Sequence, residues 1–145
     1  MNIEHLFAPF NPQETNFVER LRYWTAAMPD ETAFRYLTYG GTLTEQLTFR
    51  QLDQRARSIG AHLAAMGLRG QRALLMYPSG LEFVAAFFGC HYAGVTPVPA
   101  YPPRRNRNMG RINAISEDAQ AAIVLTIDEV IQRSHGMLDL SLIHI

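Results

Sequence analysis

Apolar residues recur along the chain at two spacings, and each spacing predicts a different kind of element. Between residues 14 and 28, apolar side chains return every three or four positions, which is typical of one face of an amphipathic helix. Residues 32–39 and 42–47 are rich in β-branched and aromatic side chains, and they flank the pair Gly40-Gly41. Two such runs around a Gly-Gly pair predict a β-hairpin.

A second helix is predicted to begin after Thr48. A threonine at this position can accept a hydrogen bond from the N–H three residues on, and Gln51 occupies the reciprocal position of a capping box. We expect the helix to end at Gly67, because glycine is favoured just past a helix C-terminus. Its buried side should carry Leu52, Ala56, Ile59 and Leu63.

The remainder of the chain alternates between strand-like and helix-like segments. Two continuous apolar runs, 72–77 and 121–126, are typical of strands that are buried on both faces. A shorter strand is expected at 95–98. The intervening helices are predicted at 81–92 and at about 109–120, and a further helix should start at 128–133. This alternation predicts an α/β fold of parallel βαβ units with right-handed crossovers, preceded by a helix and a hairpin.

Composition narrows the classes of function. The 145 residues are 48% hydrophobic and 18% charged with a net charge of zero, so the balance gives no reason to expect a nucleic-acid partner. All 13 basic residues are arginine, which excludes a lysine-dependent phosphate loop, a Schiff-base lysine and a lysine general base within these residues.

The sequence is expected to belong to a soluble cytoplasmic protein. Its one cysteine, Cys90, cannot form an internal disulfide and suits a reducing compartment. Residues 1–10 lack the basic start of a secretory signal. The longest apolar stretch, 81–95, contains Glu82 and His91 and is too short to span a bilayer, so no transmembrane segment is predicted.

Several local features of the sequence are candidate binding sites. The turn Tyr77-Pro78-Ser79-Gly80 joins a strand to a helix, where open α/β sheets bind ligands. We expect Ser79 to cap that helix, and the alternative is an anion at the helix N-terminus. A cluster of arginines after the prolines is expected to be a solvated basic loop, and the alternative is contact with a phosphate or a carrier protein. The cluster consists of Arg104, Arg105, Arg107 and Arg111.

Four aromatic residues on one helix are expected to pack against the sheet, although one or two could line an acyl-chain tunnel. They are Phe83, Phe87, Phe88 and Tyr92. Cys90 and His91 point about 100° apart on a helix and do not form a dyad, so Cys90 is interpreted as a core residue. The histidines, among them His62 and His135, have no partners at metal-ligand spacing, and no metal site is predicted.

Two segments carry a resemblance to a known family. The segment Leu47-Thr48-Phe49-Arg50-Gln51-Leu52 is followed at 81–103 by LEFVAAFFGCHYAGVTPVPAYPP. In this order and at this distance they resemble the first two core motifs of adenylate-forming enzymes. The form AGVTPVPAYPP at 93–103 is most similar to the fatty acyl-AMP ligases. Gly94 and the prolines of this segment are expected to shape the chain path rather than to do chemistry.

The resemblance implies an N-terminal part of an enzyme that joins a fatty acid to ATP, releases pyrophosphate and passes the acyl group to an acyl carrier protein, often for polyketide or lipopeptide assembly. ATP and Mg²⁺ would be the cofactors of the whole enzyme. In the family the phosphate loop lies downstream of the matched segment and the catalytic lysine lies in a C-terminal domain. No catalytic, cofactor-binding or metal residue is therefore carried onto a position here, and we expect this chain alone to be inactive.

Three parts of the chain are distinguished. Residues 1–13 are expected to form a loose lead-in, and residues 14–139 an incomplete N-terminal part of an AMP-binding domain. Residues 140–145 fit the codons CTG TCT CTT ATA CAC ATC, the mosaic-end adaptor of transposase-based sequencing libraries. We expect the reading frame to run into adaptor after Asp139. The alternative is a short apolar tail that begins a strand.

Other functions remain open at this point. Within the enzymes, the alternatives are a fatty acyl-CoA synthetase and an amino-acid adenylation domain, and the exit Val98-Pro99-Ala100-Tyr101-Pro102-Pro103 favours the acyl-AMP ligases over both. A non-catalytic α/β binding module is a different class. A dinucleotide-binding module is disfavoured because no G-x-G-x-x-G follows a predicted strand.

Overall fold

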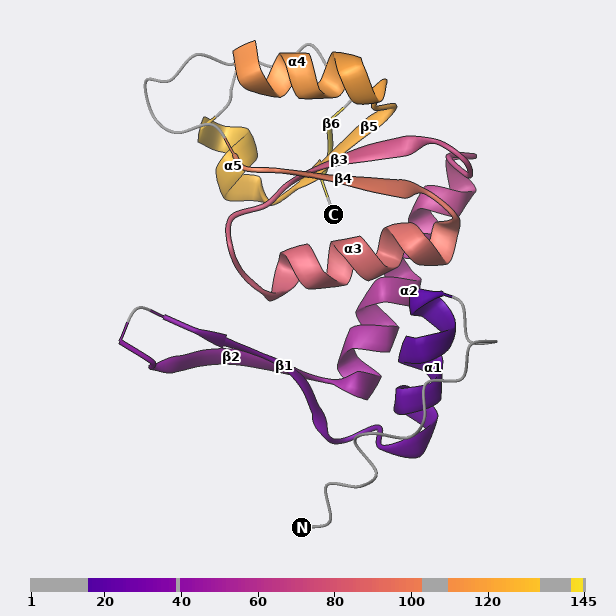
Figure 1. Cartoon of the computed structure of the whole chain (residues 1–145), viewed down its shortest axis with the longest axis vertical. Coiled ribbons are helices and arrows are strands. Elements are labelled where there is room, and N and C mark those ends of the chain that lie inside the picture. The colour runs from indigo at the N-terminus through magenta and orange to yellow at the C-terminus, as the bar shows by residue number, and fades with distance from the viewer. Residues whose placement is uncertain (1–15, 39, 103–109, 134–141, 145) are drawn as a thin grey trace.

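The computed structural model describes residues 16–38, 40–102, 110–133 and 142–144 (Figure 1). Its helices are α1 (Phe17–Ala27), α2 (Phe49–Ala65), α3 (Leu81–Ala93), α4 (Gly110–Ala119) and α5 (Asp128–Arg133). Its strands are β1 (Thr32–Leu37), β2 (Leu43–Thr48), β3 (Arg72–Met76), β4 (Thr96–Ala100), β5 (Ile123–Thr126) and β6 (Leu142–His144). The predicted helix, hairpin and strand–helix alternation are confirmed, each within a few residues at the ends.

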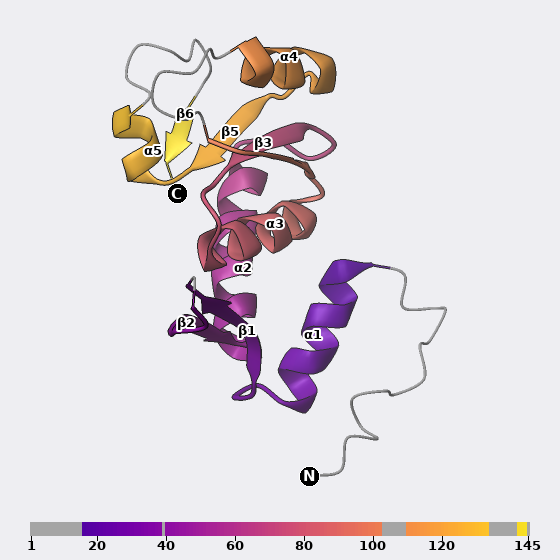
Figure 2. The same cartoon turned by 60° about the vertical axis from the view of Figure 1, so that its left-hand side comes forward.

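A parallel sheet with the strand order β4-β3-β5-β6 forms the centre of the α/β part. Helix α3 lies on one side of the sheet, and α4 and α5 lie on the other (Figure 2). The side chains of β3 are buried on both faces, as its apolar run predicts. Ala73 and Leu75 belong to the core shared with α2 and α3, whereas Leu74 and Met76 pack with Ile112 of α4.

The hairpin of β1 and β2 extends away from the start of α2 (Figure 1). The two strands are antiparallel, with Tyr36 opposite Glu45, and the register shifts at two points. At the turn, Gly40 and Gly41 have φ angles of 95° and 81°, a left-handed conformation that favours glycine. The predicted role of the Gly-Gly pair is thereby confirmed.

The helix boundaries also follow local signals. The N–H of Gln51 donates to the Thr48 hydroxyl over 3.2 Å, and the Thr48 N–H donates to the Gln51 side chain over 3.0 Å, which completes the predicted capping box. Gly94 ends α3 with a φ of 68°, and its N–H points to the last carbonyls of the helix.

Strand β4 lies at the edge of the sheet, which explains how it tolerates two prolines. The N–H of Thr96 donates to Gln71 over 2.9 Å, on the side of β3. Because N–H groups alternate between the two edges of a strand, the nitrogens of Pro97 and Pro99 face away from β3. Neither proline therefore removes a hydrogen bond from the ladder, and the outer edge lacks donors at both positions.

Helices α2 and α3 approach closely at two glycines. A Cβ atom on Gly60 would lie 2.7 Å from the Cβ of Tyr92, and one on Gly89 would lie 2.6 Å from Ile59. Beside this contact, the Tyr92 hydroxyl donates to the carboxylate of Asp53, which is 7% exposed. The contact fixes α3 on α2 and so positions the N-terminal end of α3.

The last described residues form β6, which runs parallel to β5 with Val124 opposite Leu142. This arrangement agrees with the alternative that the tail begins a strand. The adaptor origin of residues 140–145 and the boundaries at 13 and 139 stay predictions.

Candidate functional site

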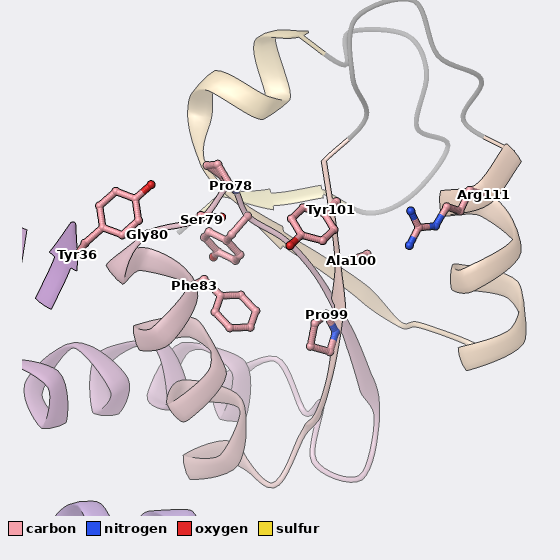
Figure 3. Close-up of a pocket in the computed structure, with 10 residues that line it drawn as sticks. Tyr36, Pro78, Ser79, Gly80, Phe83, Pro99, Ala100, Tyr101 and Arg111 are labelled. Atoms are coloured by element: carbon pink, nitrogen blue, oxygen red, sulfur yellow. The ribbon is translucent and has the colours of Figure 1, made fainter. Parts of the chain in front are cut away.

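A cavity of about 490 Å³ opens at the carboxyl ends of β3 and β4 (Figure 3). This edge is where open α/β sheets bind their ligands. The turn after β3 and the end of β4 form two walls, and the hairpin, α3 and α4 each add one residue. The lining residues are Tyr36, Tyr77, Pro78, Ser79, Gly80, Phe83, Pro99, Ala100, Tyr101 and Arg111.

The walls of this cavity are mainly apolar and aromatic. The ring of Phe83, in the first turn of α3, faces Pro99 of β4 (Figure 3). Tyr101 follows β4 and is 72% exposed, an unusual position for a large aromatic side chain without a partner surface. An exposed aromatic side chain of this kind becomes buried only when a ligand or another part of a protein covers it.

Among the described residues that line the cavity, only Arg111 is charged. Arg111 reaches from α4 toward Ala100 and Tyr101 (Figure 3). Tyr77 is only 5% exposed. Burial, followed by the nearby Cys90 and Glu82, raises its pKa well above the usual value, so its phenol stays neutral. The cavity is thus suited to an anion with an apolar body.

A second, smaller cavity of about 260 Å³ shares Tyr36 and the turn 78–80 with the first. Its remaining walls include the carboxylates of Glu45 and Glu82. The Glu82 carboxylate accepts a hydrogen bond from Arg55 over 2.9 Å, at the surface between α2 and α3. The two cavities therefore differ in charge, and the acidic one does not suit an anion.

The prediction that Ser79 caps α3 is wrong. The N-cap residue is Gly80, in an extended conformation with a φ of 162°, and no side chain accepts a hydrogen bond from the first turn. Ser79 is exposed instead and lines both cavities. The sequence pattern predicted the N-cap one residue too early. Glycine can adopt the extended backbone conformation that precedes a helix as readily as serine can, so the residue type did not identify the cap.

The predicted arginine cluster is only partly within the described residues. Arg111 is exposed on α4 and lines the larger cavity. Arg104, Arg105 and Arg107 lie outside the described residues, so the expectation of a solvated basic loop stays a prediction for them.

The aromatic residues of α3 divide between two environments. Phe83 lines the cavity, which favours the alternative that some of these residues face a ligand. Phe87 and Phe88 make edge-to-face contacts with Phe17 of α1, at 5.7 and 6.1 Å between ring centroids. Phe88 also contacts Phe34 of β1, and Phe87 also contacts Phe83, so the ring contacts of this pair among the described residues run to α1, to the hairpin and along α3 rather than to the parallel sheet. The sheet side of α3 is formed by small residues, Ala85, Ala86 and Cys90.

Cys90 and His91 behave as structural residues. Cys90 is fully buried, and burial raises the pKa of its thiol to about 12, so it is a core residue as predicted. The His91 ring contacts Phe17 and Phe87, 5.1 and 4.8 Å from their centroids, and its buried Nε2 has no hydrogen-bond partner among the described residues. Burial lowers the His91 pKa.

Neither a metal centre nor a membrane helix is found in the part of the chain that the structure describes. No group of three or more His, Cys, Asp or Glu side chains there could hold a metal ion. His62 is exposed on α2, and His135 lies outside the described residues. Within the same described ranges, every helix is too short or too polar to cross a bilayer.

Sequence reasoning did not find Tyr36 as part of the site. It lies 43 residues before Ser79 along the chain, and only the packing of the hairpin against α3 brings the two together. Pro99 and Tyr101 were found as a sequence signal but were interpreted as architectural. No local pattern could have indicated their position on the cavity wall, because that position depends on the parallel pairing of β3 and β4.

Comparison with known proteins gives a consistent result. The family model described as "AMP-binding enzyme" matches residues 21–142. The medium-chain-fatty-acid–[acyl-carrier-protein] ligase JamA of Moorena producens is 41% identical over 118 residues, 79% of this chain and 20% of JamA. The long-chain-fatty-acid–AMP ligase FadD26 of Mycobacterium tuberculosis is 35% identical over 106 residues, 71% of this chain and 18% of FadD26.

A solved structure gives the same picture. The fatty acid AMP ligase from Legionella pneumophila superposes with a TM-score of 0.81 at 30% identity, and the match covers 94% of this chain and 25% of that one. The chain spans about a fifth of the length of the curated relatives it matches. It corresponds to their N-terminal fifth.

Proposed function

The chain belongs to the AMP-binding enzyme family, and we propose that it forms the N-terminal part of a fatty acid–AMP ligase. One observation carries this proposal. The segment Pro99-Ala100-Tyr101, which bears the resemblance to the fatty acyl-AMP ligases, is also one wall of the cavity at the carboxyl edge of the sheet. The naming of JamA and FadD26 as ligases of fatty acids supports the same substrate class.

The proposed reaction has two steps. A carboxylate oxygen of the fatty acid attacks the α-phosphorus of ATP, a new P–O bond forms and pyrophosphate leaves. The thiol of an acyl carrier protein then attacks the acyl carbonyl, and AMP leaves. The second step follows JamA, whose name gives an acyl carrier protein as acceptor.

The described residues do not fit the nucleotide part of this chemistry. No acidic cluster among them could place Mg²⁺, and the sequence has no lysine to stabilise the charge that develops on the phosphate. In the proposed reaction, the residues that hold ATP and Mg²⁺ are therefore not among the described residues of this chain. What these residues supply is a rigid sheet edge, with a neutral, largely apolar cavity and one cation at its rim.

A cytoplasmic location is part of the proposal. ATP and acyl carrier proteins are cytoplasmic, and the free, buried Cys90 suits a reducing compartment.

The test starts from the source gene, read through the codons for Asp139 and Leu140 in an adaptor-free library. The full-length protein is then assayed for ATP–pyrophosphate exchange with fatty acids of 6 to 18 carbons, with amino acids as the competing substrates. Fatty-acid-dependent exchange, with acyl-adenylate identified by mass, is the expected result. Acceptors are compared next, and transfer to holo-carrier protein but not to coenzyme A is expected.

Three outcomes would contradict parts of the proposal. Exchange that depends on amino acids indicates an adenylation domain. Transfer to coenzyme A indicates an acyl-CoA synthetase. A full-length protein with no exchange on any carboxylate favours a non-catalytic α/β binding module.

A further inference from the structure

Thr126 is a polar side chain in an otherwise apolar strand. It is the last residue of β5, whose other residues are isoleucine, valine and leucine, and it is fully buried. Its hydroxyl donates a hydrogen bond to the Met76 carbonyl over 2.5 Å. A buried hydroxyl has to find an acceptor, and this one finds it on the neighbouring strand. The bond therefore ties the carboxyl end of β5 to the carboxyl end of β3.

This hydrogen bond lies where the pairing of the two strands ends. Met76 opposite Thr126 is the last pair in the register of β3 and β5. Met76 is also the last residue of β3, and the turn at residues 77–80 follows it directly. The Met76 carbonyl and the Tyr77 N–H belong to one planar peptide unit. The Thr126 hydroxyl thus fixes the orientation of the peptide from which the turn starts.

The turn at residues 77–80 has few other contacts that could hold it. No side chain caps α3 at its N-terminal end. Among the described residues, no backbone hydrogen bond joins residues 77–79 to another loop. The turn is itself stiff, because Pro78 has a fixed φ angle and restricts Tyr77 before it to extended conformations. A rotation of the first peptide is therefore carried on to the end of the turn, since no soft joint absorbs it.

We propose that Thr126 is a positioning residue of the carboxyl edge, and that its hydroxyl, acting through the Met76 carbonyl, sets where the turn at residues 77–80 lies. The turn contributes to the walls of both cavities, whereas Thr126 itself lines neither. The carboxyl edge is where open α/β sheets bind their ligands, so the placement of this wall acts on the reaction. The inference about activity rests on the proposed function, and the inference about the position of the turn does not.

The experiment compares the full-length wild-type protein with Thr126→Val, which keeps the shape of the side chain and removes the hydroxyl. Thr126→Ser keeps the hydroxyl and should restore wild-type behaviour. Crystal structures of the three proteins should show the turn displaced by roughly 1 Å in the valine variant alone, a misplacement that can cost about 100-fold in rate. The kcat/KM for ATP–pyrophosphate exchange should accordingly fall by roughly 10- to 100-fold in that variant.

A kinetic constant separates positioning from a general loss of stability. A smaller folded fraction lowers the apparent kcat and leaves KM unchanged, whereas a displaced wall also changes KM for a substrate of the exchange reaction. Val124→Ala is the matched control, because Val124 is fully buried two residues before Thr126, on the same face of β5. This control should lose stability through packing and keep the wild-type KM values and the wild-type position of the turn.

The outcomes for the two proposals are distinguishable. If the wild-type protein shows no fatty-acid-dependent exchange, the proposed function fails, and the crystal structures alone decide the role of Thr126. An undisplaced turn in Thr126→Val overturns the inference, and so do unchanged KM values in an active enzyme. A serine variant that behaves like the valine variant, or a Val124 variant with the same change in KM, also overturns it.

Discussion

His91 illustrates how one side chain couples packing to pH. Its ring contacts Phe17 and Phe87, and within the described ranges its buried Nε2 has no hydrogen-bond partner. Burial therefore lowers its pKa below the usual 6.5. The folded state binds a proton less readily than the unfolded state, so stability is expected to decrease as pH falls below 6.5 and to level off below the lowered pKa.

This prediction is tested by the free energy of unfolding of the full-length protein between pH 7.5 and 5. His91→Phe should reduce the loss of stability toward acid pH, since the new ring keeps the contacts with Phe17 and Phe87 and cannot be protonated. The matched control is His62→Phe, on the exposed side of α2, where the wild-type pH dependence is expected. An unchanged acid slope in the His91 variant would contradict the prediction.

Gly60 carries a second prediction at the scale of a residue. Alanine at this position would bring its Cβ to 2.7 Å from the Cβ of Tyr92 and 3.1 Å from the Gly89 carbonyl. Because both neighbours belong to a packed helix, Gly60→Ala is expected to destabilise the fold by about 1–3 kcal/mol. In the absence of a clash, alanine stabilises a helix more than glycine does. A loss of stability in Gly60→Ala therefore identifies the clash.

Chemical denaturation of the full-length protein measures this change. Gly80→Ala serves as the control, because no atom lies within 4 Å of the added Cβ and the backbone there is extended. The control should be neutral or slightly stabilising. A stabilised Gly60→Ala variant would show that α2 and α3 do not approach as closely as described.

At the scale of elements, the buried Asp53 links α2 to α3. Its carboxylate accepts hydrogen bonds from the Tyr92 hydroxyl and, over 2.7 Å, from Arg57. Burial, then the hydrogen bond to Asp53, raises the pKa of Tyr92 to about 12, so the hydroxyl keeps its proton. Tyr92→Phe removes one donor from a nearly buried charge, and we expect a loss of about 1.5–3 kcal/mol in stability.

Thermal unfolding provides the measurement, with Tyr23→Phe on the exposed side of α1 as the matched control. Only the Tyr92 variant should melt at a lower temperature. Equal melting temperatures for the two variants would mean that the Asp53 carboxylate finds other partners at no cost.

Most elements of this fold could be predicted because their signals are local. The capping box at Thr48, the Gly40-Gly41 turn and the glycine that ends α3 act within a few residues, so spacing was sufficient. The cavity could not be predicted in the same way. Its walls come from five segments of the chain, and their meeting depends on the parallel pairing of β3 with β4 and on the packing of the hairpin.

At the scale of the whole molecule, this chain of 145 residues is expected to behave poorly when it is expressed alone. Large apolar side chains such as Phe17, Leu37 and Tyr101 are exposed, at 54%, 53% and 72%. Exposed apolar surface of this kind promotes aggregation unless another part of a protein covers it. The chain alone should also lack carboxylate-dependent ATP–pyrophosphate exchange, because it has no lysine and its described residues have no acidic cluster.

Two measurements check this expectation. The soluble fraction of the 145-residue polypeptide is compared with that of the full-length protein expressed in the same way, and exchange activity is measured on whatever is soluble. A monodisperse, soluble chain would contradict the first part of the prediction, and clear exchange from it would contradict the second.

The two prolines of β4 have a consequence for the order in which the sheet is built during translation. Strands β3 and β4 leave the ribosome before β5, and an unpaired strand edge on a nascent chain can recruit the neighbouring chain on the same messenger RNA. Pro97 and Pro99 remove donors from the outer edge of β4, so the free edge of β3 is the better partner for the next strand. Growth of the sheet is therefore favoured on the side of β3 where β5 pairs.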